Sequence, residues 1–165
     1  MGAIKQRITN CLWFDSEAEQ AAAHYVSIFP NSRIGGITWY GKEGFEFHQK
    51  PEGSVMTVSF FLDAQEFLGL NGGPLFKFNE AMSLMIKCET QKDIDHYWYK
   101  LSEGGKESQC GWLTDKFGVS WQIIAEDWIS MINDPDKEKV KRVTNALFKM
   151  AKPELDVLKR AFNGE

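Results

Sequence analysis

The chain has 165 residues, of which 43% are hydrophobic and 25% are charged, and this composition is typical of one folded domain and excludes a disordered chain. Its formal net charge of −4 argues against a nucleic-acid binder, which normally has a surplus of Lys and Arg. No apolar run reaches membrane-spanning length, and no signal-peptide pattern opens the chain. Its three cysteines, Cys11, Cys88 and Cys110, form no CxxC pair, which is typical of reduced thiols. We therefore expect a cytoplasmic protein with neither nucleic-acid nor membrane partners.

The first half of the chain predicts the element order β-α-β-β-β. A strand is expected at residues 5–14, and Ser16 with Glu19 then forms a capping-box pattern at the start of a helix that ends at Pro30. Alternation of apolar and polar residues predicts three further strands, at 33–40, at 55–62 and in a segment ending at Asn71. The intervening segment, 41–54, is expected to be a long loop.

The second half repeats this pattern. A strand is predicted at 83–88, Thr90 and Asp93 form a second capping box, and Gly104-Gly105 ends the helix. A β-hairpin follows, with strands at 111–113 and 119–124. The shared order of strand, capped helix and terminal hairpin predicts a pseudo-duplicated domain.

Residues 126–165 do not continue the repeat and predict helices. The pattern gives a short helix at 127–132, a longer one capped by Asp136, and a last one with Pro153 at its first position. Their apolar faces need a partner surface, either the outside of the sheet or a second subunit.

Several segments of the chain resemble a known family. They are Leu12-Trp13-Phe14-Asp15, Leu70-Asn71-Gly72-Gly73-Pro74 and the cluster from Gln109 through Cys110-Gly111-Trp112-Leu113 and Asp115-Lys116-Phe117-Gly118 to Gln122. They resemble the PhnB-like branch of the glyoxalase/bleomycin-resistance group, the vicinal oxygen chelate superfamily. The resemblance covers essentially the whole chain. It implies an α+β domain (1–165) of paired βαβββ modules, 5–74 and 83–125, with a C-terminal helical extension at 126–165. It also implies a homodimer whose curved sheets enclose a cavity in each subunit.

The resemblance also indicates where a metal would be held. Catalytic members of the superfamily bind a divalent metal through the first and last strands of each module. Carried over, those places are Thr9 or Asn10, Asn71, Ser83 and Gln122. These side chains offer only neutral oxygens, whereas divalent transition metals prefer imidazole, thiolate or carboxylate ligands. We therefore expect no bound metal and no other cofactor.

The same residues have a second interpretation as a ligand site. Asn71, Ser83 and Gln122 either form the polar floor of a cavity or satisfy one another and buried water. Trp39 and Trp112 are candidate walls for a planar ligand, while Cys110 is more typical of packing than of a nucleophile. The expected ligand-binding set is Thr9, Asn10, Trp39, Asn71, Ser83, Cys110, Trp112 and Gln122. No catalytic residue is identified.

Three functions follow from these patterns. The leading hypothesis is non-covalent binding of an unidentified small molecule that is partly aromatic or polar. The alternatives are a metal-dependent lyase, isomerase or dioxygenase of the same superfamily, and an interaction module with a vestigial cavity. Sequences resembling this one often bear the label demethylubiquinone methyltransferase-like. However, no glycine-rich turn leads from a strand into a helix here, as a Rossmann-type methyltransferase would use.

Overall fold

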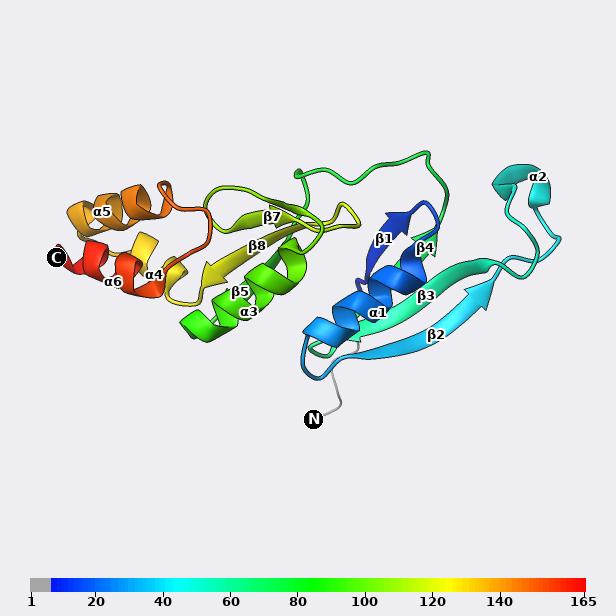
Figure 1. Ribbon diagram of the computed structural model, residues 1–165, viewed down its shortest axis with the longest axis horizontal. Coiled ribbons are helices and arrows are strands. Elements are labelled where there is room, and N and C mark those ends of the chain that lie inside the picture. Colours follow the sequence, from blue (N-terminus) through cyan, green and yellow to red (C-terminus); the bar gives the residue numbers. More distant parts are fainter. Residues whose placement is uncertain (1–6) are drawn as a thin grey trace. The chain divides into compact units, whose positions relative to one another are not determined.

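The computed structural model describes residues 7–165, so residues 5 and 6 of the predicted first strand lie outside the described part. The chain divides into two compact units, Met1–Lys77 and Phe78–Glu165. Each unit contains a four-stranded sheet and a helix that lies along the sheet (Figure 1). Within residues 7–165 we find no helix with the length and apolar character needed to cross a membrane.

The first unit has the predicted β-α-β-β-β order. Its elements are β1 (Asn10–Phe14), α1 (Ala18–Ile28), β2 (Arg33–Trp39), β3 (Val55–Leu62) and β4 (Gln65–Asn71). The strands are arranged β1-β4-β3-β2, with β1 parallel to β4 and the other pairs antiparallel. The predicted loop at 41–54 also contains a short helix, α2 (Phe45–His48).

The second unit repeats the arrangement. Its elements are β5 (Leu84–Cys88), α3 (Gln91–Ser102), β6 (Lys106–Glu107), β7 (Trp112–Thr114) and β8 (Ser120–Ala125). The strand order is β5-β8-β7-β6, again with one parallel pair, β5 and β8. The two sheets thus share one topology, which confirms the predicted duplication. The chain ends in α4 (Trp128–Ile132), α5 (Lys137–Leu147) and α6 (Leu155–Asn163).

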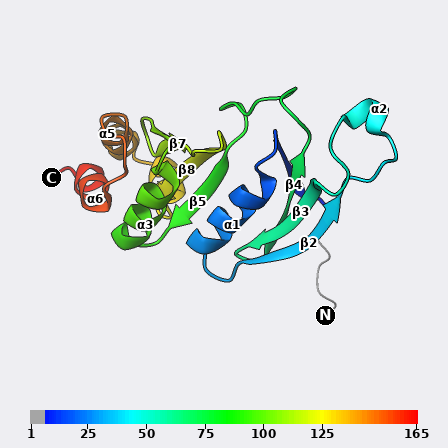
Figure 2. The same ribbon diagram turned by 45° about the vertical axis from the view of Figure 1, so that its right-hand side comes forward.

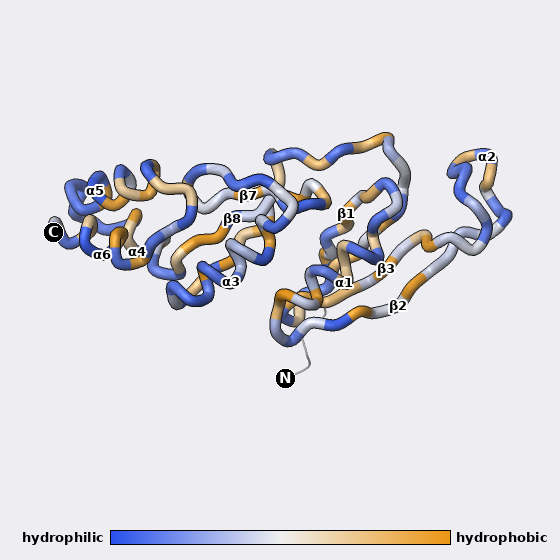
Figure 3. Tube along the Cα trace, viewed as in Figure 1, coloured by the Kyte–Doolittle hydropathy of each residue, from blue (hydrophilic) through white to orange (hydrophobic). Residues whose placement is uncertain are grey.

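Each sheet buries one face under its helix. In the first unit α1 packs mainly on β3 and β4, where Tyr25 and Phe60 are completely buried. In the second unit α3 lies along the sheet in both views (Figure 1, Figure 2) and buries Ile94 and Trp98. Figure 3 shows β8 in apolar colours and α5 largely in hydrophilic ones. Each large apolar side chain buried in this way stabilises the fold by about 1.5–3 kcal/mol.

The two predicted capping boxes have different outcomes. The second is confirmed: Thr90 Oγ1 accepts the amide N–H of Asp93, and the Thr90 N–H donates to the Asp93 carboxylate. The first is wrong, because α1 begins after Glu17 without a cap from its own segment. Instead the Ala18 N–H donates to Asn71 Oδ1 over 2.9 Å. A residue from β4 has taken the place of the local cap.

The C-terminal extension, residues 126–165, attaches to the second unit. Asp136 caps α5 as predicted, since its Oδ1 accepts the amide of Glu138 over 2.9 Å. Pro153 is not the first helical residue, because α6 begins at Leu155 with Glu154 as its N-cap. The Pro153 carbonyl instead accepts a hydrogen bond from Gln91 Nε2 of α3. The partner surface of the extension is therefore the second module of the same chain.

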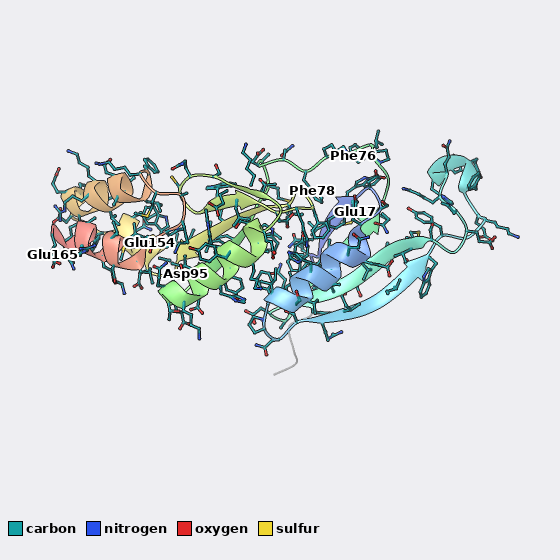
Figure 4. All side chains as sticks on the ribbon, viewed as in Figure 1. Glu17, Phe76, Phe78, Asp95, Glu154 and Glu165 are labelled. Atoms are coloured by element: carbon teal, nitrogen blue, oxygen red, sulfur yellow. The ribbon has the colours of Figure 1, made fainter. Side chains whose placement is uncertain are left out.

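An ionic cluster reinforces this attachment. Lys152, which precedes α6, pairs with Asp95 of α3 and with Glu154 (Figure 4 labels both acids). Hydrogen bonds from Lys152 and then from Gln91 lower the pKa of Asp95. Burial disfavours the charged form of Lys152, but its hydrogen bonds to Asp95 and Glu154 outweigh this, so the pKa of Lys152 is raised. Both shifts favour the charged pair.

Acid is expected to weaken the attachment of the extension. A carboxylate with a lowered folded-state pKa stabilises the fold above its unfolded pKa, about 3.9 for Asp, and loses that contribution as the pH falls through the folded pKa. Asp95→Asn should therefore unfold at a lower temperature than the native chain near pH 6, and this difference should vanish in strong acid. Thermal unfolding followed by circular dichroism across this range is the measurement. If the difference in unfolding temperature between the two chains stayed constant with pH, the charged Asp95–Lys152 pair would not be its cause.

Candidate functional site

The second unit contains a pocket of about 470 Å³ beside β6 and β7. The residues on its wall that matter most are Ser108, Gln109, Cys110, Trp112, Thr114 and Phe148. Lys106 and Glu80 add one charge of each sign. The volume lies in the range of sites for small organic molecules, which are usually apolar with a few polar groups. This wall therefore combines two aromatic side chains with hydroxyl, amide and charged groups.

A buried aspartate fixes the hairpin that forms one side of the pocket. Asp115 is only 3% exposed, and its Oδ1 accepts the backbone N–H groups of Phe117 (2.9 Å) and Val119 (3.0 Å). Its Oδ2 accepts the indole N–H of Trp121 over 2.8 Å. These bonds close the turn between β7 and β8, and so they hold Trp112 and Thr114 in position on β7.

The entry to β7 is equally constrained. Cys110 and Gly111 both have a positive φ, of 60° and 83°. A Cβ at Gly111 would lie 2.2 Å from the carbonyl oxygen of Ile123, so only glycine fits there. The amides of Cys110 and Gly111 donate to the carbonyls of Met150 and Ala151. The Cys110 side of the pocket is thereby joined to the C-terminal extension.

Ser83 and Gln122 are brought together, as one of the two sequence interpretations expects. Gln122 Nε2 donates to Ser83 Oγ over 2.8 Å. Gln122 also lies opposite Trp112 in the β7–β8 ladder, so the two side chains share one face of the sheet. Neither Ser83 nor Gln122 lines the pocket itself. Gln122 lies on β8 and Ser83 just before β5, and the two side chains already bond to each other.

Asn71 lies in a different environment. It is 6% exposed, on the side of the first sheet that α1 covers. Its Oδ1 accepts from Ala18, and its Nδ2 donates to the carbonyl of Val55 over 3.1 Å. Both ends of the side-chain amide are therefore used within the first unit, and the contacts are those of a helix cap.

The remaining predicted residues also belong to the first unit. Thr9 is exposed just before β1, and Asn10 lies opposite Phe67 in the β1–β4 ladder. Trp39 ends β2 and is 58% exposed. Of the eight sequence-predicted ligand residues, Cys110 and Trp112 line the pocket of the second unit. Phe148 was not predicted, since no local pattern links a residue after a surface helix to a distant hairpin.

The strand registers show which positions of the two modules correspond. Cys11 pairs with Leu68 in the first sheet, and Met85 pairs with Gln122 at the same place in the second. The counterpart of Gln122 is therefore Leu68. Asn71 lies three residues further along β4, on the opposite face. Asn71 therefore does not occupy the place in its module that Gln122 occupies in the second.

The residues at these corresponding places do not fit the divalent metal that the superfamily implies. Ser83 and Gln122 supply neutral oxygens in the second module, while Thr9 and Leu68 supply one hydroxyl in the first. Neutral donors do not offset the dehydration of a dication as carboxylates, thiolates or imidazoles do. In the described part of the chain, residues 7–165, no three His, Cys, Asp or Glu side chains are grouped as metal ligands would be.

The thiols of Cys88, which is buried, and Cys11, which is exposed, are poor nucleophiles. All three cysteines are free. Burial, with a smaller contribution from Asp93, raises the pKa of Cys88 to about 12, and burial raises the pKa of Cys11 as well. Because the thiolate is the reactive form, neither thiol is activated for catalysis at neutral pH.

Comparison with known proteins identifies the family. Residues 6–124 match the family model described as 3-demethylubiquinone-9 3-methyltransferase. A solved structure from Bacillus cereus, described as a putative 3-demethylubiquinone-9 3-methyltransferase, PhnB protein, is 36% identical over 73% of this chain and 99% of its own, with a TM-score of 0.64. A Pseudomonas aeruginosa protein of 16% identity, matching 74% of this chain and 98% of its own with a TM-score of 0.58, shares the fold.

No curated protein matches the chain. The family match spans both βαβββ modules and ends at Ile124, so the C-terminal extension lies beyond it. The duplicated sheet topology and the sequence match lead to the same assignment. The chain belongs to the family described as 3-demethylubiquinone-9 3-methyltransferase, the PhnB-like branch of the glyoxalase/bleomycin-resistance superfamily.

Proposed function

We propose that this protein binds a small, partly aromatic or polar metabolite non-covalently, in the pocket of its second unit and without a catalytic metal. The observation that supports this most directly is the pocket of about 470 Å³ itself, whose wall includes Cys110 and Trp112. Trp112 offers an aromatic surface, and the hydroxyl and amide groups nearby offer donors and acceptors. The proposal includes a homodimer, which the family resemblance implies, and a cytoplasmic location, which the three cysteines without a CxxC pair favour.

Binding is favoured over metal-dependent catalysis by the chemistry of the donor set. The positions that correspond to metal ligands hold serine, glutamine, threonine and leucine. A lyase, isomerase or dioxygenase of this superfamily would need stronger ligands there. Elemental analysis of the purified protein tests this point, because stoichiometric zinc, nickel, iron or manganese would overturn the choice of a binding protein over a metalloenzyme.

Methyl transfer is not part of the proposal, although the family description names it. A Rossmann-type methyltransferase binds its cofactor at a glycine-rich turn between a strand and a helix. In this chain Gly72-Gly73 follows β4, and the segment from there to β5 contains no helix. The residues therefore do not fit S-adenosylmethionine in that manner. Calorimetric titration with S-adenosylmethionine should give no saturable heat.

A ligand screen with paired tryptophan variants tests the proposed pocket. Ligands found by thermal shift should stabilise the native protein increasingly with concentration. Trp112→Ala should weaken the binding of each of these ligands by about tenfold, as expected when an aromatic contact worth about 1.4 kcal/mol is removed. Trp39→Ala, in the first unit, is the matched comparison and should leave the affinity unchanged. If Trp39→Ala weakened binding and Trp112→Ala did not, the binding site would not be the pocket of the second unit.

A further inference from the structure

The C-terminal extension lies beyond the residues that the family model matches. The family model ends at Ile124, and the Bacillus cereus protein is matched over 99% of its length by only 73% of this chain. About a quarter of this chain thus has no counterpart in that relative. The extension nevertheless contributes Phe148 to the wall of the pocket.

Several contacts hold Phe148 at this place. Val143 and Leu147 anchor α5 in the core, and the Phe148 amide donates to Thr144 at the end of the helix. Two residues further on, the Met150 carbonyl accepts the amide N–H of Cys110 over 2.9 Å. The position of Phe148 relative to the Cys110 side of the pocket is therefore set by the backbone.

The Phe148 ring itself is poorly covered. It is 64% exposed, although the residues just before and after it are packed or hydrogen-bonded. A single exposed apolar side chain is ordinary on a protein surface, but this one borders a pocket that also has Trp112 in its wall. Two aromatic side chains from different elements, in a wall that also contains hydroxyl and amide groups, match a planar ligand with hydrogen-bonding substituents.

We propose that the C-terminal extension determines the ligand selectivity of this pocket, with Phe148 packing against a planar aromatic ligand that Trp112 also contacts. This inference rests on the proposed binding function and adds the ligand class to it. Polar substituents of the ligand bond to groups such as Ser108, Gln109 and Thr114. Because one cation, Lys106, and one anion, Glu80, border the pocket, its wall has no net charge, which suits a neutral ligand. A relative without the extension lacks this wall and takes a different range of ligands.

Two probes of the same carbon skeleton test the inference. One is 2-naphthol, which is planar and aromatic, and the other is decahydro-2-naphthol, its saturated counterpart. Both are titrated into the full chain while the amide signals of Trp112 and Leu113 are followed by NMR. Phe148→Leu keeps an apolar side chain but removes the ring. It should therefore weaken the binding of 2-naphthol by about three- to tenfold and change the affinity for decahydro-2-naphthol little. Val157→Ala, on α6 and outside the pocket, should leave the affinity for both probes unchanged.

The outcomes separate this inference from the function on which it rests. If Phe148→Leu leaves the preference between the two probes unchanged, the extension does not set selectivity, and the pocket remains a binding site. If neither probe moves the pocket signals while another ligand of the screen does, the aromatic class is wrong. If no ligand moves them, the proposed binding function fails, and this inference fails with it.

Discussion

Asp115→Ala is expected to lower the free energy of unfolding by about 3–5 kcal/mol, because it removes the acceptor of three hydrogen bonds at a buried turn. The Trp121 indole N–H and the Val119 amide would then be left buried without this partner. Hydrogen bonds to a charged acceptor are worth about 1.5–3 kcal/mol each, and an unsatisfied buried donor costs a similar amount. The loss is larger than for an ordinary surface substitution, which is usually within about 0.5 kcal/mol.

Urea unfolding followed by tryptophan fluorescence measures this loss. Asp115→Asn is the control, because it keeps one acceptor oxygen for the two backbone amides but presents an NH₂ group toward the Trp121 N–H. We expect it to lose about 1–3 kcal/mol, less than the alanine variant. If alanine at this position cost under 1 kcal/mol, the turn would not depend on the carboxylate. The same variants should also weaken ligand binding, since the turn positions Trp112 and Thr114.

Most of the fold could be predicted from the sequence because its signals are local. The alternation in residues 55–62 predicted β3, and the Thr90–Asp93 pattern predicted the start of α3. In both cases the deciding interactions lie within one turn or one strand. The duplication was visible for the same reason, since each module repeats local patterns in the same order.

The errors arose where a distant residue replaced a local one. Ser16 and Glu19 fit the capping-box pattern, but Asn71 from β4 reaches the first amide of α1. Pro153 fits the first position of a helix, but its carbonyl bonds to Gln91 and the helix starts later. Local sequence contains no information about such partners, so local preference was overridden by tertiary contact.

The candidate site was harder to predict than the fold for a similar reason. The face of a strand on which a residue lies depends on whether its offset from a reference position is odd or even. A match displaced by three residues, as between Leu68 and Asn71, therefore changes the face as well as the position. Phe148 illustrates the other difficulty, because it lies in the C-terminal extension, far along the chain from the hairpin whose pocket it borders.

Asn71→Leu is expected to cost about 2–4 kcal/mol of stability and to leave ligand affinity in the second unit unchanged. The substitution removes the cap of α1, which is worth about 1 kcal/mol. It also leaves the Val55 carbonyl without its donor in a mostly covered position, at a further cost of about 1–3 kcal/mol. Urea unfolding measures the free energy of unfolding of this variant, and titration with any ligand from the screen measures its affinity.

Asn71→Asp distinguishes a helix cap from a ligand contact. Aspartate keeps the acceptor for the Ala18 amide and places a negative charge at the positive end of α1, which is favourable by about 0.3–1 kcal/mol. Aspartate cannot donate to the Val55 carbonyl, so part of the loss of stability should remain. The stability of Asn71→Asp should therefore fall between those of the native and leucine chains. A residue of a pocket floor would behave in the opposite way, because both variants would reduce affinity while stability changed little. Stability that follows the order Asn, Asp, Leu at constant affinity is therefore the result that the hydrogen bonds of Asn71 require.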